Sequence, residues 1–273
     1  MKELIHFTNG SYHTPQNRGA ALSRLSPSLP FYARLIAIVA RSSRRAKRGR
    51  YDTWDWAASS FDVLNALEHA GVQFHITGVD NIAGTDGPCL FIGNHMSSLE
   101  TFILPCIIVP FKDVTFVVKK SLIDYPVFKY VMRSRDPVTV GRTNPRDDLR
   151  AVLDGGSEIL KSGRSIVIFP QTTRTHVFDP GEFNTIGIKL AKKAGVPVIP
   201  VALRTDAWGT GRRLKDFGPI DPAKTVHFAF GSPLHVADRG TGEHRAIIAF
   251  ITAKLREWGA DVRAGIGTGG SSD

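Results

Sequence analysis

In the segment Phe91-Ile92-Gly93-Asn94-His95-Met96-Ser97-Ser98-Leu99-Glu100 an apolar, strand-like run leads to a histidine, and a carboxylate follows five residues later. Ser97 and Glu100 have the spacing of a capping box, which predicts that a helix begins there with Ser97 as its N-cap. A histidine that follows a strand of an open α/β sheet lies at the edge where such sheets place their ligands. Because histidine titrates near neutrality and a carboxylate can orient it, His95 and Glu100 form a candidate pair for proton transfer.

Short apolar runs alternate with helical patterns over most of the chain. The predicted strands are Cys89–Ile92, Thr115–Val118, Pro137–Val140, Ser165–Phe169, Val198–Val201 and Val226–Phe230. Between the third and fourth, Asn144 and Pro145 have the positions of a helix cap and a first helical residue, and Gly163 that of a terminator. Further helices are predicted up to Gly195 and over residues 238–258. This alternation predicts an α/β fold with a largely parallel central sheet flanked by helices.

The first part of the chain has a helical pattern, with Phe61, Leu64 and Leu67 recurring every three or four residues before Gly71. The spacing predicts an N-terminal helical pair. The expected organisation is a helical, membrane-associating segment over residues 1–70, an α/β domain over residues 71–260 and a flexible Gly/Ser-rich tail over residues 261–273.

Basic residues are concentrated directly after an apolar segment, Leu29 to Ala40, in a chain with a formal net charge of +10. They are Arg41, Arg44, Arg45, Lys47, Arg48 and Arg50. Such a cluster suits an anionic membrane surface, where each cation contributes about 1 kcal/mol. A merely solvated helix end is the plain alternative, and the lack of a recognisable nucleic-acid module argues against nucleic acid as a partner. Arg34 interrupts the apolar segment, which falls short of the ~20 residues that a spanning helix needs.

Composition places the chain among globular proteins, since 273 residues with 42% hydrophobic side chains supply a sizeable core. Cys89 and Cys106 lie in or beside apolar stretches and have no metal-ligand spacing, which predicts buried thiols in a reducing compartment. The first residues lack the apolar core of a secretory signal. With the basic cluster, this predicts a peripheral protein on the cytoplasmic face of a membrane.

Cations recur where the predicted strands end. Lys119 and Lys120 follow the second strand, Arg142 the third and Arg174 the fourth. Because parallel strands end at one edge of the sheet, these cations are expected near His95. Such a site suits an anionic substrate, and the planar fork of arginine suits phosphate well. The alternative for any single arginine is a surface ion pair.

Four ordered blocks give the chain a specific resemblance. They are residues 94–100, Val140-Gly141-Arg142, Phe169-Pro170-Gln171-Thr172-Thr173-Arg174-Thr175 and Val196-Pro197-Val198-Ile199-Pro200-Val201. In order and spacing they resemble the blocks of the glycerolipid acyltransferase family, whose best-known members are 1-acyl-glycerol-3-phosphate acyltransferases. The resemblance covers roughly residues 71–236 and includes the family's last strand and turn at residues 226–234.

The resemblance implies that His95 is the general base that takes the proton from an acceptor hydroxyl, and that Glu100 holds and stabilises the charged His95. The hydroxyl then attacks the thioester of acyl-CoA or acyl carrier protein, with no cofactor, metal or covalent enzyme intermediate. The acceptor it implies first is lysophosphatidic acid, and the product phosphatidic acid. Together with the charge pattern, it gives as substrate-binding residues Lys120, Arg142, Gln171, Thr173 and Arg174, with residues 197–201 shaping an acyl pocket.

Three residues depart from the family's usual pattern. Glu100 replaces an aspartate, Gln171 a glutamate and Thr172 a glycine. An amide donates as well as accepts hydrogen bonds, so contacts to the acceptor head group are expected to differ. Two alternatives follow: an acyltransferase for another lysolipid or an aminolipid, and a non-catalytic lipid-binding homologue.

Overall fold

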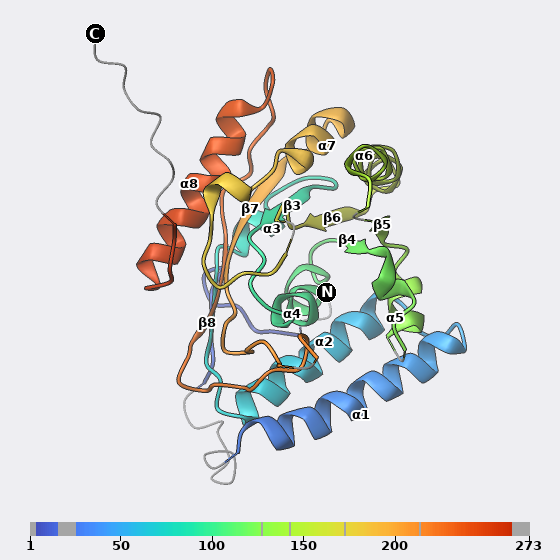
Figure 1. Ribbon diagram of the computed structural model, residues 1–273, viewed down its shortest axis with the longest axis vertical. Coiled ribbons are helices and arrows are strands. Elements are labelled where there is room, and N and C mark those ends of the chain that lie inside the picture. Colours follow the sequence, from blue (N-terminus) through green and yellow to red (C-terminus); the bar gives the residue numbers. More distant parts are fainter. Residues whose placement is uncertain are drawn as a thin grey trace.

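The computed structural model describes residues 4–15, 26–126, 128–141, 143–171, 173–212 and 214–263. In these residues one eight-stranded sheet has the order β1-β2-β8-β7-β3-β6-β4-β5 (Figure 1). Its strands are β1 (Tyr12–His13), β2 (Phe74–Thr77), β3 (Leu90–Gly93), β4 (Val114–Lys119), β5 (Val138–Val140), β6 (Ser165–Ile168), β7 (Val198–Arg204) and β8 (Val226–Phe230). The helices are α1 (Ser28–Lys47), α2 (Thr53–His69), α3 (Asp80–Ala83), α4 (Leu99–Ile108), η2 (Lys120–Ile123), α5 (Lys129–Arg133), α6 (Pro145–Lys161), η3 (Pro180–Glu182), α7 (Ile186–Ala194) and α8 (Thr241–Glu257).

The sheet is mostly parallel, as the alternation of strands and helices predicts. β3 lies between β6 and β7 and is parallel to both, β4 is parallel to β5 and β6, and β2 is parallel to β8. The pairs β1–β2 and β7–β8 are antiparallel. A loop over residues 205–225, which contains no described helix, joins β7 to β8, and an antiparallel pair needs no crossover helix. The fold is therefore α/β with antiparallel pairs on one side of the sheet.

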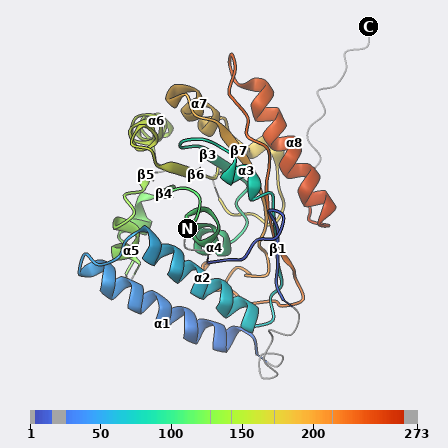
Figure 2. The same cartoon turned by 180° about the vertical axis from the view of Figure 1, so that it is seen from behind.

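Alternate residues of the central strands face two separate cores. Leu90 and Ile92 of β3 pack with α6, α7 and α8, whereas Phe91 packs with α1, α2 and α4. Both views show α1 outside α2 on one side of the sheet and α6, α7 and α8 on the other (Figures 1 and 2). Because strands with both faces covered must be apolar throughout, they give the continuous apolar runs seen in the sequence.

Each of the six predicted strands corresponds to a strand of the sheet, with ends that differ by up to three residues. β1 and β2 were not predicted. In β2 the apolar Phe74 and Ile76 alternate with His75 and Thr77, so no continuous run marks it, and β1 is only two residues long. The α6 helix begins as predicted, with the Asn144 side chain accepting a hydrogen bond from the Arg146 N–H.

The helices α1 and α2 pack along each other and are joined by the ion pairs Arg41–Asp62 and Arg45–Asp55. The chain reverses between them at Gly49, whose φ is +66°, and an Asp52 capping box starts α2. On the outer side of α1, Leu29 and Ile36 are 73% and 63% exposed. In the described residues no helix combines the length and the apolar character that crossing a membrane requires.

The start of the expected tail contacts the domain: Phe178 and Val262 form a parallel bridge, and the Arg263 N–H donates to the Phe178 carbonyl at 2.8 Å. The rest of that tail, residues 264–273, lies outside the described residues. Cys89 and Cys106 are buried free thiols, and burial raises the pKa of Cys89 to about 11 and that of Cys106 to about 12.

Three histidines lie side by side across the strands β1, β2 and β8. The register pairs His13 with His75 and His75 with His227, and their ring centroids are 4.5 and 5.1 Å apart. The Trp258 ring stacks on His227 at 4.8 Å. Burial, followed by the neighbouring His13, lowers the pKa of His75. Burial, followed by His75 and Arg204, lowers the pKa of His227 to about 4 against the opposing charges of Glu257 and Asp206.

These histidines predict a loss of stability in acid. In the folded state His227 stays neutral down to about pH 4, whereas in the unfolded chain it is protonated below about pH 6.5. The free energy of unfolding is therefore expected to decrease as the pH falls from about 6.5 towards 4. In His227→Gln we expect the free energy of unfolding to decrease in acid by about 1 kcal/mol less than in wild type, a figure reduced for the partial exposure of the ring. Urea unfolding at pH 7.5 and pH 5 measures this, with the exposed His69→Gln as control. An unchanged pH dependence in the His227 variant would contradict it.

Candidate active site

His95 and Glu100 are in direct contact at the carboxyl edge of β3. The His95 Nδ1 and the Glu100 Oε1 are 2.8 Å apart, and the His95 side chain is 16% exposed while Glu100 is fully buried. With Nδ1–H donating to the carboxylate, neutral His95 carries its lone pair on Nε2. The helix α4 begins at Leu99 with Ser98 at the N-cap position, one residue later than predicted. The capping contacts predicted for Ser97 and Glu100 are nevertheless present, since the Ser97 N–H donates to Glu100 Oε1 at 2.9 Å and the Ser97 hydroxyl accepts from the Leu99 N–H at 3.0 Å.

The Glu100 carboxylate is held by several donors at once. Its Oε1 accepts from the N–H groups of Met96 and Ser97 at 2.7 and 2.9 Å, and its Oε2 accepts from the Thr205 hydroxyl at 2.6 Å. Burial alone would raise the pKa of Glu100. The hydrogen bond and charge of His95, with the bonds from Thr205 and Ser97, outweigh burial and lower that pKa, so the carboxylate is ionised.

Neighbouring strands fix the position of the His95 backbone and ring. The Asn94 side chain both donates to the Leu203 carbonyl and accepts from the Leu203 N–H, each at 2.8 Å, which fastens the end of β3 to β7. The Gln171 Oε1 accepts from the His95 N–H at 2.7 Å. The Phe169 ring stacks on the imidazole, with centroids 4.4 Å apart and planes 3° from parallel. The imidazole of His95 therefore has a fixed orientation.

Arg174 lies on the same side of the sheet as His95 and is linked to the start of α4. Its guanidinium forms an ion pair with Asp216 and donates to the Ser98 hydroxyl. The Ser98 hydroxyl also donates to Asp216 at 3.1 Å. The adjacent Thr175 N–H donates to the His95 carbonyl at 3.0 Å, so the backbone beside Arg174 is joined to that of His95. A cation thus lies at the same edge as the histidine, as the strand-end pattern predicts.

The other predicted site residues have different surroundings. Gln171 is only 3% exposed and accepts from the His95 N–H, so it lies behind the His95 backbone and not on an open surface for a head group. Among the described residues its Nε2 has no hydrogen-bond partner. Lys120 is exposed at the same edge, but β6 separates its strand from β3, and no hydrogen bond or ion pair of the described residues joins it to His95, Glu100 or Arg174. Thr173 is exposed beside Arg174. Arg142 and Thr172 lie outside the described residues.

Sequence reasoning missed four residues of the site. Thr205 and Asp216 follow β7 and lie more than 100 residues from Glu100 along the chain, whereas Ser98 and Phe169 are within the family blocks but were given no role. A polar Thr205 directly after an apolar strand is a signal of the same kind that marked His95. Nothing in the sequence pairs Asp216 with Arg174.

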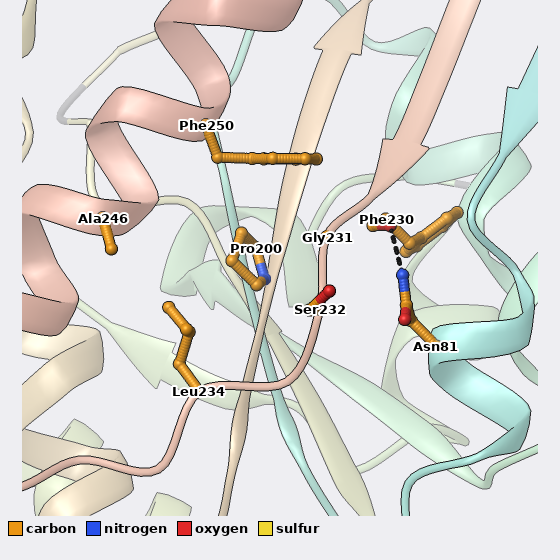
Figure 3. Close-up of a pocket in the computed structure, with 8 residues that line it drawn as sticks. All are labelled: Asn81, Pro200, Phe230, Gly231, Ser232, Leu234, Ala246 and Phe250. Carbon is orange, nitrogen blue, oxygen red and sulfur yellow. Dashed lines mark hydrogen bonds between the residues drawn. The ribbon is translucent and has the colours of Figure 1, made fainter.

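A cavity of about 340 Å³ lies elsewhere, between β7, α8 and the end of β8 (Figure 3). It is lined by Asn81, Pro200, Phe230, Gly231, Ser232, Leu234, Ala246 and Phe250. Pro200, expected to shape an acyl pocket, points into this cavity, which shares no residue with the cluster around His95. Across the described parts of the chain, no group of three or more His, Cys, Asp or Glu side chains is arranged to hold a metal ion.

This arrangement can perform one kind of step directly. The Nε2 of His95 can accept a proton from a hydroxyl, and the buried Glu100 carboxylate can stabilise the imidazolium that forms. The side chain of Arg174 is 31% exposed and offers a cation for an anionic group of the same substrate once its own partner leaves.

Comparison with known proteins gives consistent results. The sequence model of a family described as Acyltransferase matches residues 73–204, which contain the His95–Glu100 pair and Arg174. A 1-acyl-sn-glycerol-3-phosphate acyltransferase of Pseudomonas aeruginosa is 27% identical over 242 residues, or 89% of this chain and 82% of that protein. A chloroplastic enzyme of the same name from Brassica napus is 31% identical over 137 residues, which are 50% of this chain and 38% of that protein.

The fold has also been observed in a crystal structure. That of the 1-acyl-sn-glycerophosphate acyltransferase PlsC from Thermotoga maritima matches with a TM-score of 0.61 over 85% of this chain and 94% of that one. The identity is 19%, so this likeness concerns the fold alone.

Proposed function

Since the chain belongs to the glycerolipid acyltransferase family and is an O-acyltransferase, we propose that it transfers a fatty acyl chain to the free hydroxyl of lysophosphatidic acid and forms phosphatidic acid. The observation that carries the proposal is the 2.8 Å contact between His95 Nδ1 and Glu100 Oε1 at the carboxyl edge of β3. The names of the relatives from Pseudomonas and Brassica support the choice of acceptor.

In the proposed reaction His95 is the general base. The acceptor hydroxyl gives its proton to Nε2 as its oxygen forms a bond to the thioester carbonyl carbon. The carbon–sulfur bond then breaks, and the proton passes from His95 to the departing thiolate, so the enzyme ends the cycle unchanged. Glu100 keeps Nδ1 protonated and stabilises the imidazolium between the two proton transfers.

The acceptor's phosphate binds to Arg174, whose guanidinium donates to the hydroxyl of Ser98, the N-cap residue of the helix α4 that carries Glu100. Lys120 adds positive charge to the same edge of the sheet, and Thr173 adds an exposed hydroxyl. By its place in the family block, Arg142 is a further phosphate ligand. The donor is acyl-CoA or acyl carrier protein, both anionic thioesters suited to a protein of net charge +10, and the reaction uses no cofactor.

A second candidate acceptor is a lysolipid or aminolipid without a bare phosphate. It is favoured by the ion pair between Arg174 and Asp216, which leaves that part of the site close to neutral. It is also favoured by the neutral Gln171 at a position where the family usually has a glutamate.

The test is acyl transfer from acyl-CoA and from acyl carrier protein to a panel of lysophospholipids, with the products read by mass spectrometry. Phosphatidic acid formed from lysophosphatidic acid supports the proposal. A diacyl product only with lysophosphatidylcholine, lysophosphatidylethanolamine or an aminolipid selects the second candidate. Binding to vesicles without product from any acceptor would indicate a lipid-binding protein.

We further propose that α1 lies on the cytoplasmic surface of an anionic membrane. Leu29 and Ile36 are two helical turns apart and therefore share its exposed side, and the exposed Arg44 lies near the end of the helix, with the exposed Arg48 directly after it. An apolar stripe beside cations suits the interface of an acidic bilayer.

The double variant Arg44→Gln/Arg48→Gln is expected to bind phosphatidylglycerol-containing vesicles about 30-fold more weakly, since each cation contributes about 1 kcal/mol at an acidic surface. Vesicle sedimentation at fixed ionic strength measures this. The matched control Arg150→Gln/Lys161→Gln removes two exposed charges from α6, on the other side of the sheet, and is expected to bind within twofold of wild type. Equal losses in both variants would mean that only net charge matters.

A further inference from the structure

The guanidinium of Arg174 already has an anionic partner within the chain. One terminal nitrogen, Nη2, forms an ion pair with the Asp216 carboxylate, and the other, Nη1, donates to the Ser98 hydroxyl. Ser98 closes the set by donating to Asp216 at 3.1 Å. The side chains of Arg174 and Asp216 are 31% and 39% exposed, so this set lies at the surface of the site where an acceptor arrives. The Asp216 carboxylate thus binds the Arg174 guanidinium where an anionic group of a substrate would bind.

Contacts with α1 and α4 fix the position of the loop that carries Asp216. The Trp208 indole N–H donates to the Asp216 carbonyl at 3.1 Å, and its ring stacks on Phe102 of α4 with centroids 5.4 Å apart. Two residues beyond Asp216, the Gly218 carbonyl accepts from the Tyr32 hydroxyl of α1 at 2.5 Å. In Figure 1 this loop, between β7 and β8, runs beneath α4 and beside α1. The fold therefore delivers the carboxylate to Arg174.

A phosphate and a carboxylate compete for one guanidinium, because both bind the same fork of N–H donors and repel each other. A phosphomonoester carries close to two negative charges and repels Asp216 more strongly than a phosphodiester, which carries one. Binding of any acceptor phosphate is weakened by the fraction of time that Asp216 holds Arg174.

Resting on the function proposed above, we propose that Asp216 is a specificity-determining residue that occupies Arg174 until the acceptor's phosphate displaces it. Asp216 contacts neither His95 nor Glu100, so it acts on acceptor binding and not on proton transfer. Its removal makes phosphate binding tighter. The direction of this change distinguishes two roles of Asp216. If Asp216 competes with phosphate for Arg174, its loss strengthens phosphate binding, whereas if it only positions Arg174, its loss weakens phosphate binding.

The test is Asp216→Asn, which keeps the size of the side chain and its hydrogen bond with Ser98. Without an acyl donor no turnover occurs, so calorimetric titration with lysophosphatidic acid in detergent micelles measures binding alone. We expect the dissociation constant and the KM to fall about tenfold with kcat within twofold of wild type, and a smaller gain for lysophosphatidylcholine. In an Arg174→Gln background the same substitution is expected to change nothing, because the two residues act through one contact.

The matched control is Asp154→Asn, which removes an exposed carboxylate paired with Lys193 on the other side of the sheet and is expected to leave both constants unchanged. Unchanged or weaker binding in Asp216→Asn, in an enzyme that still acylates lysophosphatidic acid, overturns the role of Asp216 and leaves the proposed function standing. A wild type that neither binds nor acylates lysophosphatidic acid overturns both.

Discussion

Replacement of His95 by alanine is expected to reduce the kcat of acyl transfer about 10³-fold, because it removes the side chain proposed as the base that takes the proton from the acceptor hydroxyl. The structure offers no second histidine in the contacts of Glu100 among the described residues, so no neighbour can take over the role. Binding of the acceptor is expected to change little, since Arg174 and Ser98 remain. The measurement is product formation per enzyme in initial-rate assays, with acceptor affinity determined separately.

The control for this variant is the exposed His69→Ala, which removes an imidazole from the end of α2 and is expected to retain full activity. Circular dichroism shows whether the His95 variant is folded. A folded His95→Ala enzyme that turns over at a rate near that of wild type would exclude His95 as the general base. It would leave the match of residues 73–204 to the acyltransferase family unchanged.

The second large effect is expected for Glu100→Gln, which should lower kcat about 10²- to 10³-fold and the free energy of unfolding by about 3 kcal/mol. A neutral amide cannot stabilise the imidazolium form of His95. It also places an NH₂ group among donors: if this group replaces Oε2 it faces the Ser97 N–H at 3.1 Å, and if it replaces Oε1 it faces the Met96 N–H at 2.7 Å. Either orientation leaves buried donors opposed.

Two further variants separate charge from reach. Glu100→Asp keeps the carboxylate but shortens it by one methylene, and we expect it to retain about a tenth of the wild-type kcat because the Thr205 contact at 2.6 Å cannot be kept together with the His95 contact. The exposed Glu158→Gln on α6 is the control for stability. Urea unfolding and initial rates measure both effects. A Glu100→Gln enzyme with normal kcat would show that the carboxylate has no part in catalysis.

The centre of the fold could be predicted because its strands are covered on both faces. Leu90, Phe91 and Ile92 are all buried, and such continuous runs stand out in the sequence. β2 could not be found in this way, because His75 and Thr77 interrupt its pattern while Phe74 and Ile76 are buried. Its identity as a strand comes from pairing with β8, about 150 residues away, which a local pattern does not contain.

The same distinction holds for the site. His95 and Glu100 are five residues apart and could be paired from the sequence, and Arg174 could be placed at their edge because parallel strands end together. The ion pair of Arg174 with Asp216 depends on the path of an irregular loop, which no periodic pattern specifies. The contacts of Gln171 show a further limit: a family block gives a residue type its place along the chain but not whether the side chain faces outward or, as here, is buried behind His95.

The bond between Thr205 and Glu100 joins residues 105 positions apart. While the ribosome is still making the middle of the chain, the segment with His95 and Glu100 exists but β7 does not, so the carboxylate lacks its hydroxyl partner and the end of β3 lacks Leu203. A nascent chain therefore carries the two reactive side chains without the framework that aligns them. The ability to move an acyl group should appear only after the last third of the polypeptide has joined the sheet, which makes turnover itself a late signal of completed folding.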